Sequence, residues 1–134
     1  MVAATLTLYG PDDGPRLRCD VGDTPRRLTD TDMGTLVSFA SLLFTEDREW
    51  VKGIELHTVF ASSELARKRV SRLKAELASG TPILLNNRRG AYRLTAGKDG
   101  MWMNVTIWPW IEETFGARFC SELRSAYDRY KFGE

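Results

Sequence analysis

The sequence is poor in the residues from which many protein sites are built. Two of its 134 residues are cysteine, Cys19 and Cys120, and one is histidine, His57. The cysteines stand far apart in the chain, without a CxxC pair or a nearby cluster of cysteine and histidine. This spacing argues against a zinc site and is typical of proteins kept in a reducing cytoplasm.

Long apolar runs are also missing. No stretch of about 18 apolar residues is present, so we predict no membrane span. The first ten residues, MVAATLTLYG, contain neither the positive region nor the apolar region of a secretion signal. We therefore expect a cytoplasmic protein that has no membrane among its partners.

Groups that could carry catalysis are scarce in the same way. His57 has no neighbours in the sequence that suggest a triad or a ligand set, so a packing or surface role is expected for it. Glu112 and Glu113 are adjacent, so on a helix they point in different directions and do not form a carboxylate pair. The segment GPDDGP lacks the lysine of a phosphate-binding loop. We expect no enzyme, no cofactor and no metal.

Positive charge is concentrated in one segment, although the net charge of the chain is only +1. Residues 61–95 contain eight basic and two acidic residues, a net charge of +6, and the remainder of the chain carries −5. Five of the basic residues fall within RKRVSRLKAEL (67–77). Such an asymmetry is typical of a surface that binds a polyanion, although a basic helix on its own is more often simply solvated.

Alternating apolar and polar residues predict short strands near the start of the chain. TLTLYG (5–10) and RLRCDV (16–21) alternate and are separated by turn-forming residues, which favours two or three antiparallel strands. A helix is predicted from Asp30 to about Phe44, because Thr29 and Asp32 resemble a capping box and apolar residues follow at helical spacing.

The middle of the chain predicts two more helices. A short one is expected at about 53–60, and Ser62 and Ser63 are suitable N-caps for the other, at about 63–78. The apolar face of that third helix would consist of Ala66, Val70, Leu73 and Leu77.

The segment ILLNNRRGAYRLT (83–95) predicts a β-hairpin with its tip at 86–90. Another strand is predicted at MWMNVTIW (101–108), followed by a last helix from Pro109 to about Tyr130. One apolar stripe recurs every four residues along this helix: Ile111, Phe115, Phe119, Leu123 and Tyr127.

Three stretches carry a resemblance to a known family. VSRLKAEL (70–77) is similar to a recognition-helix signature, RRGAYRL (88–94) to a wing, and LRCDVGDTPRRLTDTDMGTLVSFASLL to a strand–turn–strand entry into a first helix. In this order they resemble the winged helix-turn-helix output domain of bacterial response regulators of the OmpR/PhoB type. The resemblance covers roughly residues 4–96. It departs from the family in a short loop between the second and third helices and in Ala91, where glycine is usual, and no receiver domain is expected.

The resemblance implies an α+β fold. Residues 1–96 would form a winged helix-turn-helix domain with N-terminal antiparallel strands, a three-helix core and a C-terminal β-hairpin wing. Residues 97–134 would form an extension of one strand and one amphipathic helix. The stripe of Ile111, Phe115, Phe119, Leu123 and Tyr127 would either pack on its own domain or dimerise, and both could hold.

The resemblance also implies sequence-specific binding of double-stranded DNA by a transcription regulator. A homodimer is expected because a lone winged domain contacts few base pairs and a two-fold dimer reads paired half-sites. The recognition helix at about 63–78 would enter the major groove, where arginine bonds guanine bidentately, and the wing at 83–95 would contact the flanking groove. The candidate DNA-binding residues are Ser62, Ser63, Arg67, Lys68, Arg69, Arg72, Lys74, Arg88, Arg89 and Arg93.

Two other functions remain open on the sequence alone. A winged helix can serve as a protein-interaction adaptor in a larger assembly, in which case the basic face would meet an acidic partner and the C-terminal helix another protein. The hypothesis of RNA or single-strand binding has less support. The aromatic residues do not alternate with the basic ones along the chain, as they would in a stacking platform.

Overall fold

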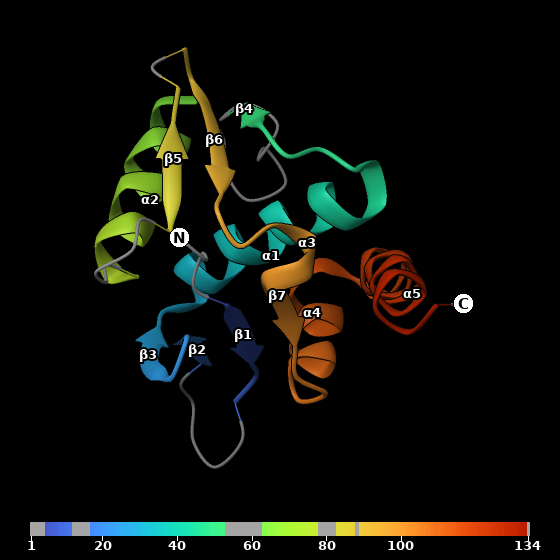
Figure 1. The fold of residues 1–134 in the computed structure, drawn as a ribbon. Helices are drawn as coiled ribbons and strands as arrows, with labels where there is room; N and C mark the ends of the chain where they lie inside the picture. The colour runs from blue at the N-terminus through green and yellow to red at the C-terminus, as the bar shows by residue number, and fades with distance from the viewer. Residues whose placement is uncertain (1–4, 12–16, 53–62, 78–82, 88, 134) are drawn as a thin grey trace.

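The computed structural model describes residues 5–11, 17–52, 63–77, 83–87 and 89–133, and for 63–66 only the backbone is described. Within these ranges the protein is α+β, with five helices and two β-sheets (Figure 1). None of the described helices combines the length and the apolar composition that crossing a bilayer requires.

The N-terminal sheet begins with three antiparallel strands, where the sequence predicts two or three. They are β1 (Leu6–Tyr9), β2 (Leu17–Val21) and β3 (Thr24–Leu28), and Leu8 of β1 lies opposite Cys19 of β2. Their alternation places Leu6, Leu8, Leu17 and Cys19 in the core, each at most 1% exposed. A fourth strand, β7 (Met101–Met103), pairs parallel to β1, which gives the order β3-β2-β1-β7.

Helix α1 (Asp30–Glu46) runs through the centre of the protein, and the start predicted for it is confirmed. The hydroxyl of Thr29 accepts a hydrogen bond from the backbone N–H of Asp32 at 3.2 Å, the first half of a capping box. All residues from Asp32 to Ala40 are buried, so the helix is covered on every side along this stretch. Asp47 is the C-cap of the helix. Its backbone is in the left-handed region, and its N–H donates a hydrogen bond to the carbonyl of Leu42.

The predicted hairpin is also confirmed. Strands β5 (Leu84–Asn86) and β6 (Ala91–Leu94) pair antiparallel, and β4 (Val51–Lys52) adds to the other edge of β6. Before the hairpin, α2 (Ser63–Glu76) packs against α1 through Val70 and Leu73. The short helix predicted at 53–60 lies outside the described residues.

The prediction for the C-terminal part is wrong in two places. The strand predicted at 101–108 ends at Met103, and α4 (Ile107–Phe115) begins before Pro109, which sits in the first helical turn, where no N–H is required. The single helix predicted from 109 to 130 is interrupted at Gly116, whose φ of 100° no helix accommodates, and α5 (Ala117–Phe132) follows. A turn of helix, α3 (Gly97–Gly100), precedes β7.

The winged helix-turn-helix arrangement as a whole is therefore not confirmed. The described chain ends in helices rather than in a hairpin, and the helix that would complete the three-helix core is not among the described residues.

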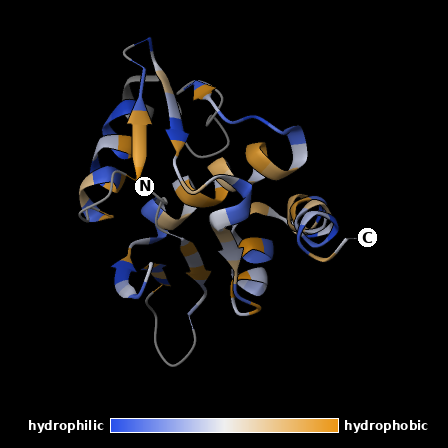
Figure 2. Cartoon of the chain, viewed as in Figure 1, coloured by the Kyte–Doolittle hydropathy of each residue, from blue (hydrophilic) through white to orange (hydrophobic). Residues whose placement is uncertain are grey.

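Residues 97–133 share one hydrophobic core with the strands and helices before them. Helix α5 packs against α1, and the phenol oxygen of Tyr127 accepts a hydrogen bond from the backbone N–H of Met103 at 3.0 Å. The rings of Phe44 and Tyr127 meet edge to face at 5.3 Å between centroids. Apolar residues gather on α1 and on the strands beside it, whereas the hairpin tip and much of α2 are hydrophilic (Figure 2).

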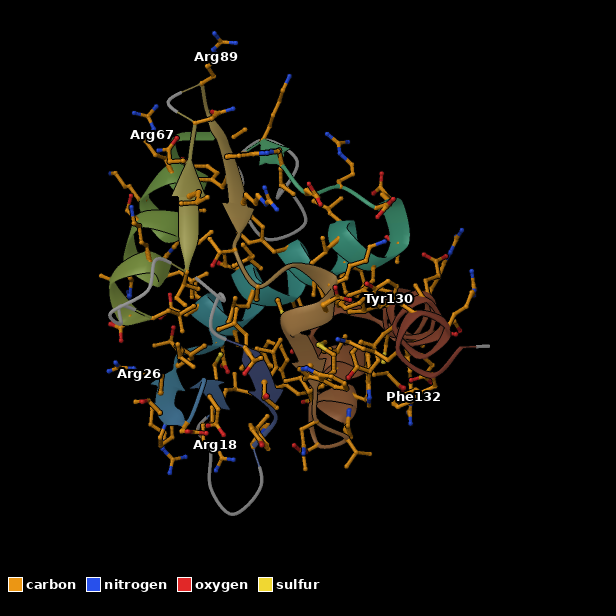
Figure 3. All side chains as sticks on the ribbon, in the orientation of Figure 1. Arg18, Arg26, Arg67, Arg89, Tyr130 and Phe132 are labelled. Carbon is orange, nitrogen blue, oxygen red and sulfur yellow. The ribbon has the colours of Figure 1, made fainter. Side chains whose placement is uncertain are left out.

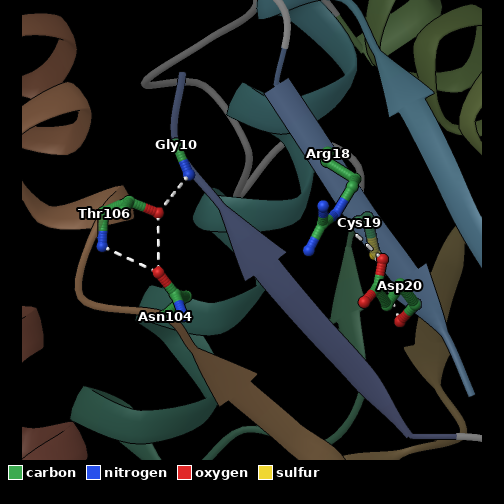
Figure 4. Close-up of polar contacts among 6 residues, drawn as sticks. All are labelled: Gly10, Arg18, Cys19, Asp20, Asn104 and Thr106. Carbon is green, nitrogen blue, oxygen red and sulfur yellow. Dashed lines mark hydrogen bonds and ion pairs between the residues drawn. The ribbon is translucent and has the colours of Figure 1, made fainter. Parts of the chain in front are cut away.

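The end of β1 is held tightly against the turn between β7 and α4 (Figure 4). The buried Gly10 donates its N–H to the hydroxyl of Thr106 at 3.0 Å, and that hydroxyl donates to the side chain of Asn104 at 2.7 Å. The N–H of Asn104 in turn reaches the carbonyl of Leu8 at 2.9 Å. A Cβ on residue 10 would lie 2.0 Å from the carbonyl oxygen of Thr106, so only glycine permits this approach.

Replacing Gly10 by alanine should therefore lower the free energy of unfolding by about 1–3 kcal/mol, measured by urea denaturation, because backbone must move to admit the methyl group. Gly22→Ala is a comparison variant: Gly22 has open space around its Cβ position, but its positive φ of 61° should by itself cost an alanine about 1–2 kcal/mol. A cost of Gly10→Ala below about 0.5 kcal/mol would show that the contact with Thr106 does not limit the packing.

Candidate nucleic-acid interface

Exposed basic side chains gather at one end of the molecule. Arg67 and Lys68 are exposed on the early turns of α2, and Arg89 is exposed at the tip of the β5–β6 hairpin. Figure 3 shows Arg67 and Arg89 at the same end of the protein, pointing away from the core. We call Arg67, Lys68 and Arg89 the basic end.

The hairpin tip is given its shape by one side chain. The amide oxygen of Asn87 accepts hydrogen bonds from the N–H groups of Arg89 at 2.8 Å and Ala91 at 3.2 Å. Gly90 supplies the positive φ of 83° that the turn requires. Arg89 therefore projects from a defined turn.

The five basic residues of α2 do not share one face of the helix. At 100° per residue, Arg67 and Lys74 fall on one flank, Lys68 faces away from the core, and Arg69 and Arg72 fall on the other flank. Arg67, Lys68 and Lys74 are exposed, whereas Arg69 is half-buried. A single flat ligand can therefore contact only part of this set.

Arg72 has an internal partner. Its Nε lies 3.8 Å from Oδ2 of Asp32, whose side chain is 1% exposed, while Arg72 is 50% exposed. The other carboxylate oxygen of Asp32 has no hydrogen-bond partner among the described residues. Since a buried carboxylate needs a compensating charge, Arg72 helps to hold α2 against the start of α1, a role that its position in the sequence did not indicate.

The other predicted DNA-binding residues either lie away from the basic end or have side chains that the structure does not describe. Arg93 lies 3.9 Å from Glu49, at the base of the hairpin. Ser63 is the first residue of α2, and its side chain is not described. Ser62 and Arg88 lie outside the described residues, as does His57, for which a packing or surface role is expected.

The apolar stripe of the last helices serves mainly the protein's own core. Ile111, Leu123 and Tyr127 are at most 3% exposed. Phe115 and Phe119 remain half-buried and stack with 4.5 Å between ring centroids, and the ring of Trp110 meets Phe115 at 6.2 Å. Within the stripe only Phe115 and Phe119 therefore leave surface that another molecule can reach, and Trp110 lies beside them.

Both cysteines are free and buried, as small apolar residues usually are. Burial raises the pKa of the Cys19 thiol to about 12. Burial also raises the pKa of Cys120, with the charge of Glu112 adding to the effect, and its Sγ lies 3.5 Å from the carbonyl oxygen of Trp108. Among the described residues no group of three or more His, Cys, Asp or Glu side chains could hold a metal ion.

A charged cleft of about 350 Å³ was not foreseen from the sequence. It lies where the end of α1, the end of β6, α3 and α5 meet, and Lys98 pairs there with Asp47. The phenol of Tyr130 donates a hydrogen bond to the carboxylate of Asp99, which raises the pKa of Tyr130. These residues come from separate segments, so no sequence motif connects them.

Comparisons with models of protein families, with curated proteins and with solved structures found no match for this chain.

Replacing Arg72 by alanine should lower the free energy of unfolding by about 1–2 kcal/mol, because Asp32 would remain buried without its cation. Lys74→Ala removes the same charge from an exposed position of the same helix and should change stability by less than about 0.5 kcal/mol. When Asp32 is already replaced by asparagine, Arg72→Ala should lower the free energy of unfolding by little more than Lys74→Ala does. An undiminished cost there would assign Arg72 a role unrelated to Asp32.

The native protein should resist a thiol-specific reagent at neutral pH. With its pKa raised from 9.0 to about 12, Cys19 holds about a thousandfold less reactive thiolate than an unperturbed thiol. With a reagent that releases a coloured group when it reacts with a thiol, the absorbance should rise slowly in buffer. In denaturant it should rise rapidly and account for both thiols. Rapid labelling of one thiol in a protein that remains folded would contradict the burial of that residue.

Proposed function

We propose that the protein binds double-stranded DNA in a sequence-specific manner through the basic end, as a cytoplasmic transcription regulator. The observation that carries the proposal is the convergence of Arg67 and Lys68 on α2 with Arg89 on the hairpin tip at one end of the molecule. Helix α2 would lie in the major groove and the hairpin would contact the flanking groove, as in a winged helix-turn-helix protein.

The dimensions and charges support this arrangement. A helix with its side chains is about 10–12 Å across and matches a major groove of about 12 Å. Arg67 is suited to a guanine edge because its guanidinium can donate two parallel hydrogen bonds, and Lys68 is suited to a phosphate. Arg89, on the tip, would hold the backbone or the minor groove beside the site.

The distribution of contacts in the structure refines the assignment of residues. Arg72 would act by positioning α2 through Asp32 rather than by reading a base. Lys74 lies on the same flank as Arg67, about two turns further along α2, a suitable place for a second phosphate contact. Arg69 is half-buried on the opposite flank and is a weaker candidate.

A homodimer belongs to the proposal, because a single small module contacts few base pairs and paired half-sites increase specificity. Its contact would be the half-buried cluster of Trp110, Phe115 and Phe119 rather than the buried part of the stripe.

Fluorescence anisotropy with a labelled duplex of random sequence, at several salt concentrations, tests DNA binding. The logarithm of the binding constant should fall with the logarithm of salt concentration by about 0.9 per phosphate neutralised. Arg89→Ala should weaken binding to all sequences alike. Arg67→Ala should cost about 1–3 kcal/mol on a selected sequence and relax the preference for it.

The matched control is Arg118→Ala, which removes one positive charge from α5, where Arg118 is 92% exposed. This variant should bind DNA as the parent does. If the parent protein does not bind duplex DNA at low salt, or if Arg118→Ala weakens binding as much as Arg67→Ala, the proposal fails, and an adaptor that recognises an acidic protein would take its place.

A further inference from the structure

The N-terminal sheet has a second face, turned away from α1, that carries aromatic and basic side chains. The residues of β1 and β2 that alternate with the core residues are Thr7, Tyr9, Arg18 and Asp20, and all four are partly exposed. On β7, Trp102 occupies the same face and is 40% exposed, although it is a large apolar residue. We call these five residues the outer sheet face.

The register of the strands orders these side chains in two rows. Thr7 lies opposite Asp20 on one side and opposite Trp102 on the other, so these three residues form one row across three strands. Tyr9 lies opposite Arg18 in the next row. Diagonal neighbours on adjacent β-strands are about 7–8 Å apart. Tyr9 and Trp102 are therefore close enough to contact neighbouring bases of one nucleic-acid strand.

Each of the two aromatic rings carries a cation. The guanidinium carbon of Arg18 lies 3.9 Å from the ring centroid of Tyr9, and Nζ of Lys131 lies 3.8 Å from the ring centroid of Trp102. Arg18 is held by Asp20, at 3.1 Å, and Lys131 donates to the backbone carbonyl of Lys98 at 2.6 Å. Arg18 and Asp20 lie on one face of β2 in Figure 4. The fold thus brings together the aromatic and basic residues that the sequence keeps apart.

Planar aromatic and guanidinium groups on an open sheet are surfaces on which unpaired bases stack, and the neighbouring cations neutralise phosphates. A base pair in a duplex presents no free face to such a surface. The chemistry therefore selects a single strand rather than a duplex.

Asp20 and Thr7 favour a ribose strand over a deoxyribose strand. The carboxylate of Asp20 repels a phosphate but accepts a hydrogen bond from a hydroxyl group, and Thr7 offers its own hydroxyl beside it. The 2′-hydroxyl of RNA both donates and accepts, and it is the group by which a protein distinguishes RNA from DNA.

We propose that the outer sheet face binds single-stranded RNA, with one base stacked on the face of Trp102 that Lys131 does not cover and another on the guanidinium of Arg18 over Tyr9. Arg18 and Arg67 lie at opposite ends of the molecule in Figure 3, so this surface is separate from the basic end. The inference does not rest on the proposed binding of duplex DNA, and either can fail alone.

Anisotropy with a labelled, unstructured RNA of about 12 nucleotides, a length within the range of single-strand sites, tests the proposal at low salt. Trp102→Ala should weaken binding about tenfold or more, whereas Trp102→Phe, which keeps a ring for stacking, should remain close to the parent. Arg18→Lys should weaken binding nearly as much as Arg18→Ala, because lysine keeps the charge but loses the planar group.

The matched control is Arg67→Ala, which removes a positive charge from the basic end and should leave RNA binding within about twofold of the parent. The same oligonucleotide made of DNA should bind about tenfold or more weakly than the RNA. Circular dichroism of each variant confirms that it is folded. If Trp102→Ala is not folded, Arg18→Lys serves as the measurement, and parent-like binding by this variant would overturn the proposal.

Three results would each overturn the proposal: no binding of RNA by the parent protein at low salt, equal binding by Trp102→Ala, or a loss in Arg67→Ala as large as that in Trp102→Ala. The last result would assign RNA binding to the basic end. A fourth result, equal affinity for the DNA strand, would overturn the choice of RNA because it contradicts the preference for ribose.

Discussion

The burial of α1 on all sides is the constraint on which the rest of the structure depends. Nine consecutive residues, Asp32 to Ala40, are inaccessible to water, so the sheet, α2 and α5 must each cover part of this helix. The polar side chains within the stretch are compatible with burial because they bond locally: Thr35 donates to the carbonyl of Thr31 and Ser38 to that of Gly34, both at 2.9 Å. Asp32 is the exception, and it draws Arg72 of α2 toward the start of α1.

This constraint separates the two surfaces that we assign to nucleic acids. The basic end is formed by elements that follow α1, whereas the outer sheet face lies on the far side of the sheet that covers it. Both surfaces are positioned by the same buried helix. A change in the packing of this helix is therefore expected to shift the residues of both surfaces. Neither surface requires a metal or a catalytic group, and each depends on charge and on planar side chains.

Sequence patterns predict the elements of this protein best where one face of an element is buried. The alternation in 5–10 and 16–21, the cap at Thr29 and the turn residues of 86–90 are local signals, and the structure confirms the strands, the start of α1 and the hairpin. MWMNVTIW alternates as a strand would, but Asn104 and Thr106 bond to each other and to β1, which ends the strand and starts a helix. Gly116 broke a stripe that continued on both sides of it.

The sites were less accessible to sequence analysis than the elements. The exposure of Arg67 and Lys68 follows from helical periodicity, since the apolar face of α2 defines the face turned outward. The pairing of Arg72 with Asp32 cannot be predicted from helical periodicity, because the two residues are distant in the chain. The outer sheet face brings Tyr9 and Arg18 beside Trp102, over which Lys131 of α5 lies, and this arrangement depends on the parallel pairing of β1 with β7.

That parallel pair also determines the order in which the protein can be assembled during synthesis. β1 leaves the ribosome before its partner β7, which ends at Met103, so one edge of β1 stays unpaired until β7 has been made. Contacts between residues so far apart in the chain form slowly, because a long loop must close first. The nascent chain is therefore an incomplete sheet with an exposed strand edge, and β7 is the segment that closes it.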